Sequence, residues 1–190
     1  MKKYIVLIMV IVGFLATGCA SKTKSEAWFT KDTKVSIPKP NFENNYHDQQ
    51  LLKFKYNDQE HSLIILLDAK DDQLKVIGLS ALGIRLFELS YTGESIKTKQ
   101  NIFIKQLPPP EQVLSDILLS ILPLKQWQAV LPQGWKLIDN DYHRQLIDDQ
   151  QNIIIDISYN QTTSNQIRKP TQIKHNIFGY QISIQSMEAK

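Results

Sequence analysis

Apolar and polar residues alternate along much of the chain between residues 51 and 185, and this pattern restricts the fold to one built around a sheet. Leu52, Phe54 and Tyr56 alternate with two lysines, which is typical of a strand with one buried face and one solvated face. Further segments with strand patterns before Pro108 are 62–67, 74–79, 83–91 and one that starts near residue 95. These segments are separated by short polar turns, so we expect about five antiparallel strands in this half of the chain.

A run of three prolines, Pro108 to Pro110, ends this meander and precedes a segment with helical periodicity. From Glu111 to Leu122, apolar residues recur at spacings of three and four, which predicts an amphipathic helix that Pro123 ends. A short second helix is expected at 125–130. Strand patterns then resume at 135–138, 142–147, 152–159, 172–175 and 177–185. The predicted fold class is therefore α+β, with a single large, curved antiparallel sheet interrupted by helices.

The first residues have the pattern of an export signal. Lys2 and Lys3 precede an apolar run from Tyr4 to Leu15, which is too short to serve comfortably as a permanent membrane span of roughly 20 residues. The segment Leu15-Ala16-Thr17-Gly18-Cys19 resembles the bacterial lipobox, which implies that residues 1–18 are a lipoprotein signal peptide and that Cys19 becomes lipidated. The alternative is an ordinary cleaved signal followed by an incidental cysteine.

The lipobox resemblance implies a location as well as a modification. Acyl chains such as palmitate on Cys19 are expected to anchor the protein stably, because two chains suffice for membrane attachment. Ala20 and Ser21, without an aspartate after the cysteine, resemble residues that send lipoproteins to the outer membrane, facing the periplasm. Residues 19–50 are interpreted as the lipidated cysteine and a polar tether, and residues 51–190 as the folded domain.

Motifs of catalysis are missing from the sequence. It contains no G-x-G-x-x-G, phosphate-binding loop, G-x-S-x-G or H-E-x-x-H motif, and its four histidines stand at no metal-ligand spacing. We therefore expect a non-enzymatic protein without metal or cofactor. Outside Lys2 and Lys3 the basic and acidic side chains nearly balance, so charge gives no reason to expect a nucleic-acid partner.

Arg85 is a charged residue on a strand side that is otherwise uncharged. It shares a strand side with Gly83, Phe87 and Leu89, and a buried arginine needs acceptors such as backbone carbonyls, a carboxylate or a ligand headgroup. The alternative is an edge arginine whose stem lies along the sheet while its head reaches water.

The order of these features resembles a known family. The lipidated cysteine, the meander, the proline-flanked helical insert and the segments Ile153–Tyr159 and Tyr180–Ile184 together resemble the lipoprotein-localisation (Lol) carrier and receptor family. That resemblance implies an unclosed β-barrel with a helical lid, a concave apolar face that holds acyl chains, and a soluble periplasmic carrier as a partner. We identify no counterpart of the receptor's protruding apolar loop in the sequence.

A second resemblance rests on a shorter segment. Leu82–Leu89, with Tyr91 and Gly93, is similar to an uncharacterised family of bacterial outer-membrane lipoproteins found with gene clusters for aryl-polyene and fatty-acid-type lipids. This similarity implies a hydrophobic cargo.

The leading hypothesis is an outer-membrane lipoprotein that binds or transfers a lipid or a lipoprotein acyl chain in a hydrophobic cavity. A curved sheet with an apolar concave face favours an aliphatic guest by about 25 cal/mol per Å² of apolar area removed from water. Strand alternation predicts these residues as ligand-binding: Leu52, Phe54, Leu63, Ile65, Leu67, Arg85, Phe87, Leu89, Ile153, Ile155, Ile157, Phe178, Tyr180 and Ile182. Three alternatives stay open: these residues fill a dry core beneath the helix, the protein is a structural or assembly lipoprotein that docks on an envelope complex through a sheet edge, or it is an enzyme that acts on lipid intermediates.

Overall fold

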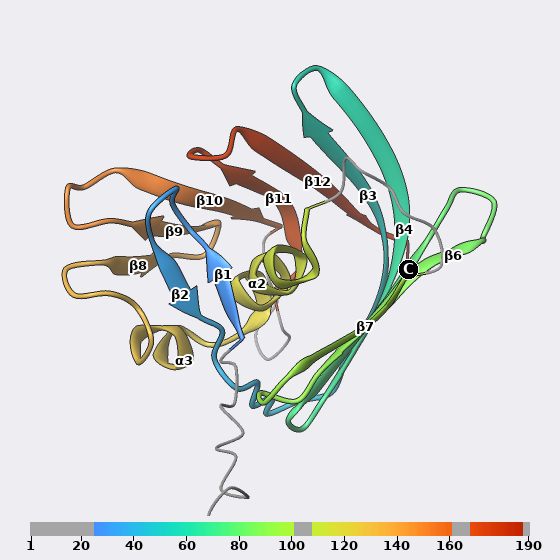
Figure 1. Ribbon diagram of the computed structural model, residues 1–190, viewed down its shortest axis with the longest axis horizontal. Coiled ribbons are helices and arrows are strands. Elements are labelled where there is room, and N and C mark those ends of the chain that lie inside the picture. The colour runs from blue at the N-terminus through green and yellow to red at the C-terminus, as the bar shows by residue number, and fades with distance from the viewer. Residues whose placement is uncertain (1–24, 101–107, 161–167, 188–190) are drawn as a thin grey trace, which may run out of the picture.

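A large antiparallel sheet dominates the protein (Figure 1). The computed structural model describes residues 25–100, 108–160 and 168–187. Within these residues the sheet has ten strands in the order β7-β6-β5-β4-β3-β12-β11-β10-β9-β8. The strands are β3 (Tyr46–Tyr56), β4 (Gln59–Lys70), β5 (Gln73–Leu79), β6 (Arg85–Tyr91), β7 (Ile96–Gln100), β8 (Lys136–Asp139), β9 (His143–Ile147), β10 (Ile153–Tyr159), β11 (Pro170–His175) and β12 (Tyr180–Ser186). Among the described residues β7 and β8 do not pair with each other, so the sheet is open.

The two halves of the sheet meet where β12 pairs with β3. Ile182 lies opposite Phe54 and Ile184 lies opposite Leu52 in this antiparallel pair. Each other neighbouring pair joins strands that are consecutive in the chain. The single long-range pairing therefore joins the early meander β3–β7 to the late meander β8–β12.

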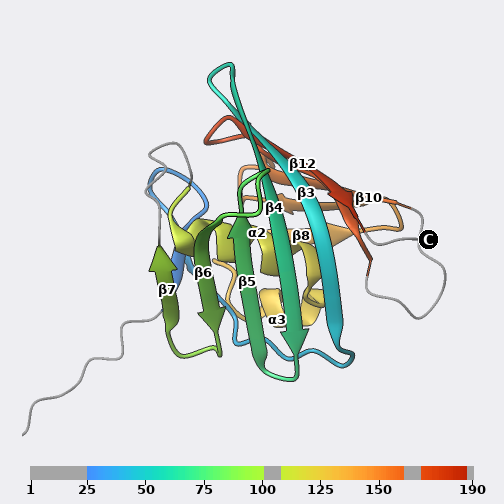
Figure 2. The ribbon, with the colours of Figure 1, turned by 90° about the vertical axis from the view of Figure 1, so that its right-hand side faces the viewer.

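Two helices, α2 (Pro110–Ile121) and α3 (Leu124–Gln128), lie on the concave side of the sheet (Figures 1 and 2). Pro110 occupies the first turn of α2, where its missing N–H costs nothing. Leu114, Leu118 and Leu122 are fully buried in the main hydrophobic core. Helix α2 therefore covers the inner face of the sheet with one of its apolar stripes.

The folded region begins earlier than the tether prediction placed it. Strands β1 (Glu26–Trp28) and β2 (Lys34–Ser36) form a separate two-stranded sheet. Phe29 is fully buried and packs edge-on against Trp127, with ring centroids 5.9 Å apart. The polar composition of this stretch suggested a tether, but Phe29 and further apolar side chains of the stretch, among them Val35 and Ile37, are buried in the core. The predicted start of the folded domain at residue 51 is therefore wrong.

The predicted antiparallel sheet with a helical interlude is confirmed, and the differences lie mainly at strand ends. Strand β3 starts at Tyr46, and β12 starts at Tyr180 because the chain turns before it at Gly179, which has a positive φ of 69°. In the part of the chain that the structure describes, no helix is both long enough and apolar enough to cross a membrane. The predicted signal peptide, residues 1–18, and the predicted lipidation site, Cys19, lie outside the described residues.

Candidate functional site

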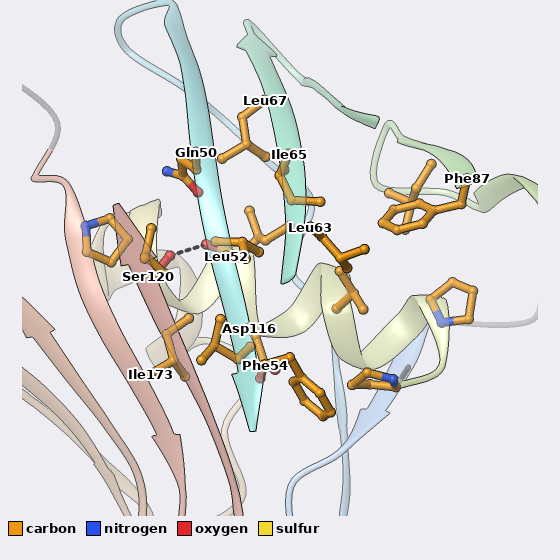
Figure 3. Close-up of a pocket in the computed structure, with 18 of the residues that line it drawn as sticks. Gln50, Leu52, Phe54, Leu63, Ile65, Leu67, Phe87, Asp116, Ser120 and Ile173 are labelled. Atoms are coloured by element: carbon orange, nitrogen blue, oxygen red, sulfur yellow. Dashed lines mark hydrogen bonds between the residues drawn. The ribbon is translucent and has the colours of Figure 1, made fainter. Parts of the chain in front are cut away.

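An apolar cavity of about 300 Å³ lies between the concave face of the sheet and helix α2 (Figure 3). Its walls come from six strands of the sheet, from α2 and from the proline run that leads into the helix. The lining residues are Gln50, Leu52, Phe54, Leu63, Ile65, Leu67, Phe87, Leu89, Thr98, Gln100, Pro108, Pro109, Pro110, Val113, Asp116, Ile117, Ser120, Ile121, Pro170, Ile173, Ile182 and Ile184. Most of these side chains are aliphatic or aromatic, as in cavities that take small hydrophobic ligands.

Eight of the fourteen residues predicted as ligand-binding line this cavity. They are Leu52, Phe54, Leu63, Ile65, Leu67, Phe87, Leu89 and Ile182. Their side chains lie on the same face of the sheet because successive residues of a strand alternate between its two faces. The period-two pattern therefore located part of the sheet wall of the cavity. The lining residues of the sheet that it missed are Gln50, Thr98, Gln100, Pro170, Ile173 and Ile184.

The predicted residues of β10 and of the β11–β12 turn do not line the cavity. Ile155 and Ile157 are fully buried in the core, whereas Ile153 is exposed on the other side of a register shift in the β9–β10 pair. Phe178 packs against His175, and the Tyr180 hydroxyl bonds to the helix instead of facing open space. For Ile155 and Ile157, the dry-core alternative is the one the structure supports.

Arg85 points away from the cavity, contrary to the predicted inward orientation. Its side chain is 54% exposed and its Nη1 lies 3.2 Å from Glu88 Oε2. The register of β5 and β6 shifts between Gly78 and Leu79, so that Arg85 pairs with Leu79 while Phe87 pairs with Gly78. This bulge separates the orientation of Arg85 from that of Phe87, and the guanidinium reaches water, as the alternative interpretation held.

Gly78 makes room for the Phe87 ring at the cavity wall. A Cβ atom at Gly78 would lie 2.2 Å from Phe87 Cε1, closer than any real contact. The Phe87 ring therefore occupies the space that a side chain at position 78 would need.

Asp116 is the one titratable residue among the described lining residues. It is 1% exposed, and its two carboxyl oxygens accept hydrogen bonds from the Tyr180 hydroxyl at 2.6 Å and from Gln112 Nε2 at 3.2 Å. Gln112 Nε2 also lies 3.1 Å from the Tyr180 hydroxyl oxygen, which closes a three-residue cluster. Burial raises the pKa of Asp116 to about 7, although the hydrogen bonds from Tyr180 and Gln112 act to lower it.

This cluster and the helix face of the cavity escaped the sequence analysis. Val113, Ile117 and Ile121 form a second apolar stripe on α2, one residue away from the stripe that faces the core. The signal was present, since the apolar arc of the helix is wider than a single buried face requires. Asp116, in contrast, has no sequence signal, because its burial depends on Tyr180, 64 residues later.

One family model matches residues 47–188, and its description is "Protein of unknown function (DUF3261)". The match covers the ten-stranded sheet except for the first residue of β3, and it includes helices α2 and α3. The chain belongs to the DUF3261 family. Comparison with curated proteins gave no match.

In this DUF3261 chain the C-terminal end of α2 is held by side chains from the second half of the sheet. Arg144 Nη1 donates to the carbonyls of Leu119 and Leu122 at 2.8 and 2.7 Å, and its Nη2 donates to Asp139 Oδ2 at 2.8 Å. The Tyr159 hydroxyl donates to the Ser120 carbonyl at 2.8 Å. A cation at these last carbonyls also suits the negative end of the helix dipole. The helix wall of the cavity is therefore fixed firmly at this end.

The turn between β5 and β6 exposes apolar side chains. Leu82 is 86% exposed and Ile84 is 53% exposed. Ser80 Oγ accepts hydrogen bonds from the backbone N–H groups of Leu82 and Ile84, and Gly83 supplies a positive φ of 76°. In this DUF3261 structure the turn therefore presents two exposed apolar side chains. Among the described residues no group of three potential metal ligands exists.

Proposed function

We propose that this protein is a non-enzymatic lipoprotein, anchored to the periplasmic face of the outer membrane, that binds or transfers a hydrophobic lipid or a lipoprotein acyl chain. The cavity of about 300 Å³ between α2 and the sheet supports this proposal. In this proposal the open sheet acts as an unclosed β-barrel, and helix α2 is the lid that covers its opening. The export-signal pattern and Cys19 support the anchored location.

The cavity volume limits how much of a chain it holds. An apolar cavity of about 150 Å³ takes one benzene molecule, which has six carbons. At about 300 Å³, this cavity has room for roughly ten to twelve carbons by the same proportion. Each methylene that leaves water contributes about 0.8 kcal/mol, which is about a fourfold change in affinity.

A series of straight-chain alcohols from hexanol to hexadecanol tests the proposal. The dissociation constant is measured by competition with N-phenyl-1-naphthylamine, an uncharged dye whose fluorescence rises in apolar surroundings. We expect affinity to rise about fourfold per methylene and to level off near ten to twelve carbons. A site on the open surface would show no such limit.

Leu52→Trp tests whether the alcohols bind in the cavity. Leu52 lines the cavity, and the larger tryptophan side chain should reduce the cavity volume. Its neighbour Leu51 does not line the cavity, so Leu51→Trp is the control. We expect Leu52→Trp to shorten the best-bound alcohol and Leu51→Trp to leave it unchanged. Absence of binding at every chain length, together with crosslinking of the anchored protein to an envelope protein, would favour the assembly role over lipid binding.

A further inference from the structure

The polar residues described in the cavity wall include one acidic side chain and no basic one. Of the described lining residues, Gln50, Thr98, Gln100 and Ser120 are neutral, and Asp116 is acidic. No lysine, arginine or histidine is among the described residues that line the cavity. A ligand with an anionic head placed in this cavity would meet a carboxyl group and, within the described wall, no compensating cation.

A second buried carboxylate, Asp48, has a cation beside it, which Asp116 does not have among the described residues that bond to it. Asp48 Oδ1 lies 3.3 Å from the Lys169 ammonium and accepts a hydrogen bond from Ser186 at 2.7 Å. Asp116 is held by neutral donors, Tyr180 and Gln112. When Asp116 ionises, its charge is therefore stabilised by dipoles, and its field extends into the low-dielectric cavity.

We propose that Asp116 makes the cavity selective for uncharged alkyl or acyl chains, carried on an alcohol, ester or amide, and that it disfavours chains with an anionic head. This inference rests on the proposed function, because it concerns the ligand class of the same cavity. Two negative charges in a poorly screened space repel each other strongly, whereas an uncharged head is insensitive to the charge of the wall. Free fatty acids are therefore poor occupants at a pH at which Asp116 is ionised.

Two buried residues near Asp116, Tyr180 and His175, have pKa values outside the neutral range. Burial, followed by the Asp116 charge, raises the pKa of Tyr180 well above its ordinary value of 10. Burial lowers the pKa of His175, whose ring centroid lies 5.0 Å from that of Tyr180, to about 4. His61 pairs with Phe54 across β3 and β4, so it lies on the cavity face of β4 and needs its own control.

The test compares decan-1-ol with decyl sulfate, which have the same alkyl chain. The alcohol stays uncharged and the sulfate stays ionised between pH 5.5 and 8.5, so any pH dependence of the ratio of their dissociation constants comes from the protein. Both ligands compete with N-phenyl-1-naphthylamine. At pH 8.5 we expect decanol to bind at least about tenfold more tightly than decyl sulfate, and we expect this preference to shrink several-fold at pH 5.5.

Asp116→Asn is the decisive variant, since it keeps the size of the side chain and one oxygen that accepts a hydrogen bond from Tyr180 or Gln112, and removes the charge. We expect its preference for decanol to be smaller than that of the native protein at pH 8.5 and to be independent of pH. His61→Gln should retain the native pH dependence. Circular dichroism and thermal unfolding check that both variants are folded.

The native protein alone already tests the inference, so it does not depend on the variant's folding. A ratio that is the same at pH 5.5 and 8.5 would overturn it, as would a pH dependence that persists in Asp116→Asn or disappears in His61→Gln. If neither decanol nor decyl sulfate binds at either pH, it is the proposed lipid-binding function that fails. Equal and tight binding of both ligands keeps that function and removes the selectivity.

Discussion

Folding shifts the pKa values of Asp116 and His175 in opposite directions. We therefore predict that each residue makes stability depend on pH, and that substitution of either residue reveals its contribution. Both residues are buried, and both contact the Tyr180 side chain. Burial raises the pKa of Asp116 from 3.8 to about 7 and lowers the pKa of His175 from 6.5 to about 4. Each change makes the folded protein favour the neutral form of the residue.

The signs follow from which state binds more protons. Between pH 4 and 7 the folded protein keeps the Asp116 proton that the unfolded chain has lost, so the stability from Asp116 falls as pH rises. Between pH 4 and 6.5 the unfolded chain binds a proton on His175 that the folded protein does not, so the stability from His175 rises with pH. At 1.36 kcal/mol per pH unit, the full changes are about 4 kcal/mol for Asp116 and about 3 kcal/mol for His175. In the native protein the two slopes largely cancel.

Urea unfolding at several values between pH 4.5 and 7 measures the free energy of unfolding for the native protein, Asp116→Asn and His175→Gln. Carboxylates common to all three proteins cancel when the curves are subtracted. Relative to the native protein, Asp116→Asn should gain stability as pH rises, by about 3 kcal/mol over this range. His175→Gln should lose a similar amount. Three parallel curves would refute the argument that these two groups are buried and neutral.

Three further substitutions test other parts of the fold. Arg144→Met keeps the buried aliphatic stem but removes the charged donor to two helix carbonyls. It should lower the free energy of unfolding by about 3 kcal/mol and the melting temperature by about 6–12 °C. A change below about 1 kcal/mol would contradict the anchoring role. Gly78→Ala should cost about 1–3 kcal/mol because its Cβ strikes the Phe87 ring, and a Phe87→Leu background should relieve most of that loss in a double-mutant cycle. Leu82→Ser should alter the free energy of unfolding by less than about 0.5 kcal/mol, because Leu82 is 86% exposed; a larger loss would show that the turn packs against something.

The strands were predictable because each carries its own pattern. Leu52 and Phe54 alternate with lysines, and the structure places both on the cavity wall. The helix over Glu111–Leu122 was predictable for a similar reason, since its apolar residues repeat at helical spacing and prolines mark its ends. Local periodicity is enough for such elements because burial of one face decides their orientation.

The failures have a different physical origin. Arg85 was predicted to face inward by counting residues along a strand, and a bulge against Gly78 and Leu79 invalidated that count. The shift between Ile153 and Ile155 had the same effect on β10. Bulges depend on the pairing with a neighbouring strand, so counting residues along β6 alone does not reveal this one, although a glycine such as Gly78 within a strand often marks a bulge. The polar cluster at Asp116 likewise requires a partner from a distant strand.

The placement of β12 between β3 and β11 affects how the chain acquires its structure. Strand β12 (Tyr180–Ser186) is the last strand in the sequence, yet its pairing with β3 joins the two meanders. Until it is available, the outer edges of β3 and β11 remain unpaired, and each can capture a strand from another molecule. Such distant pairing slows folding because a long loop must close first. A chain that is interrupted before Tyr180 should therefore accumulate as aggregates.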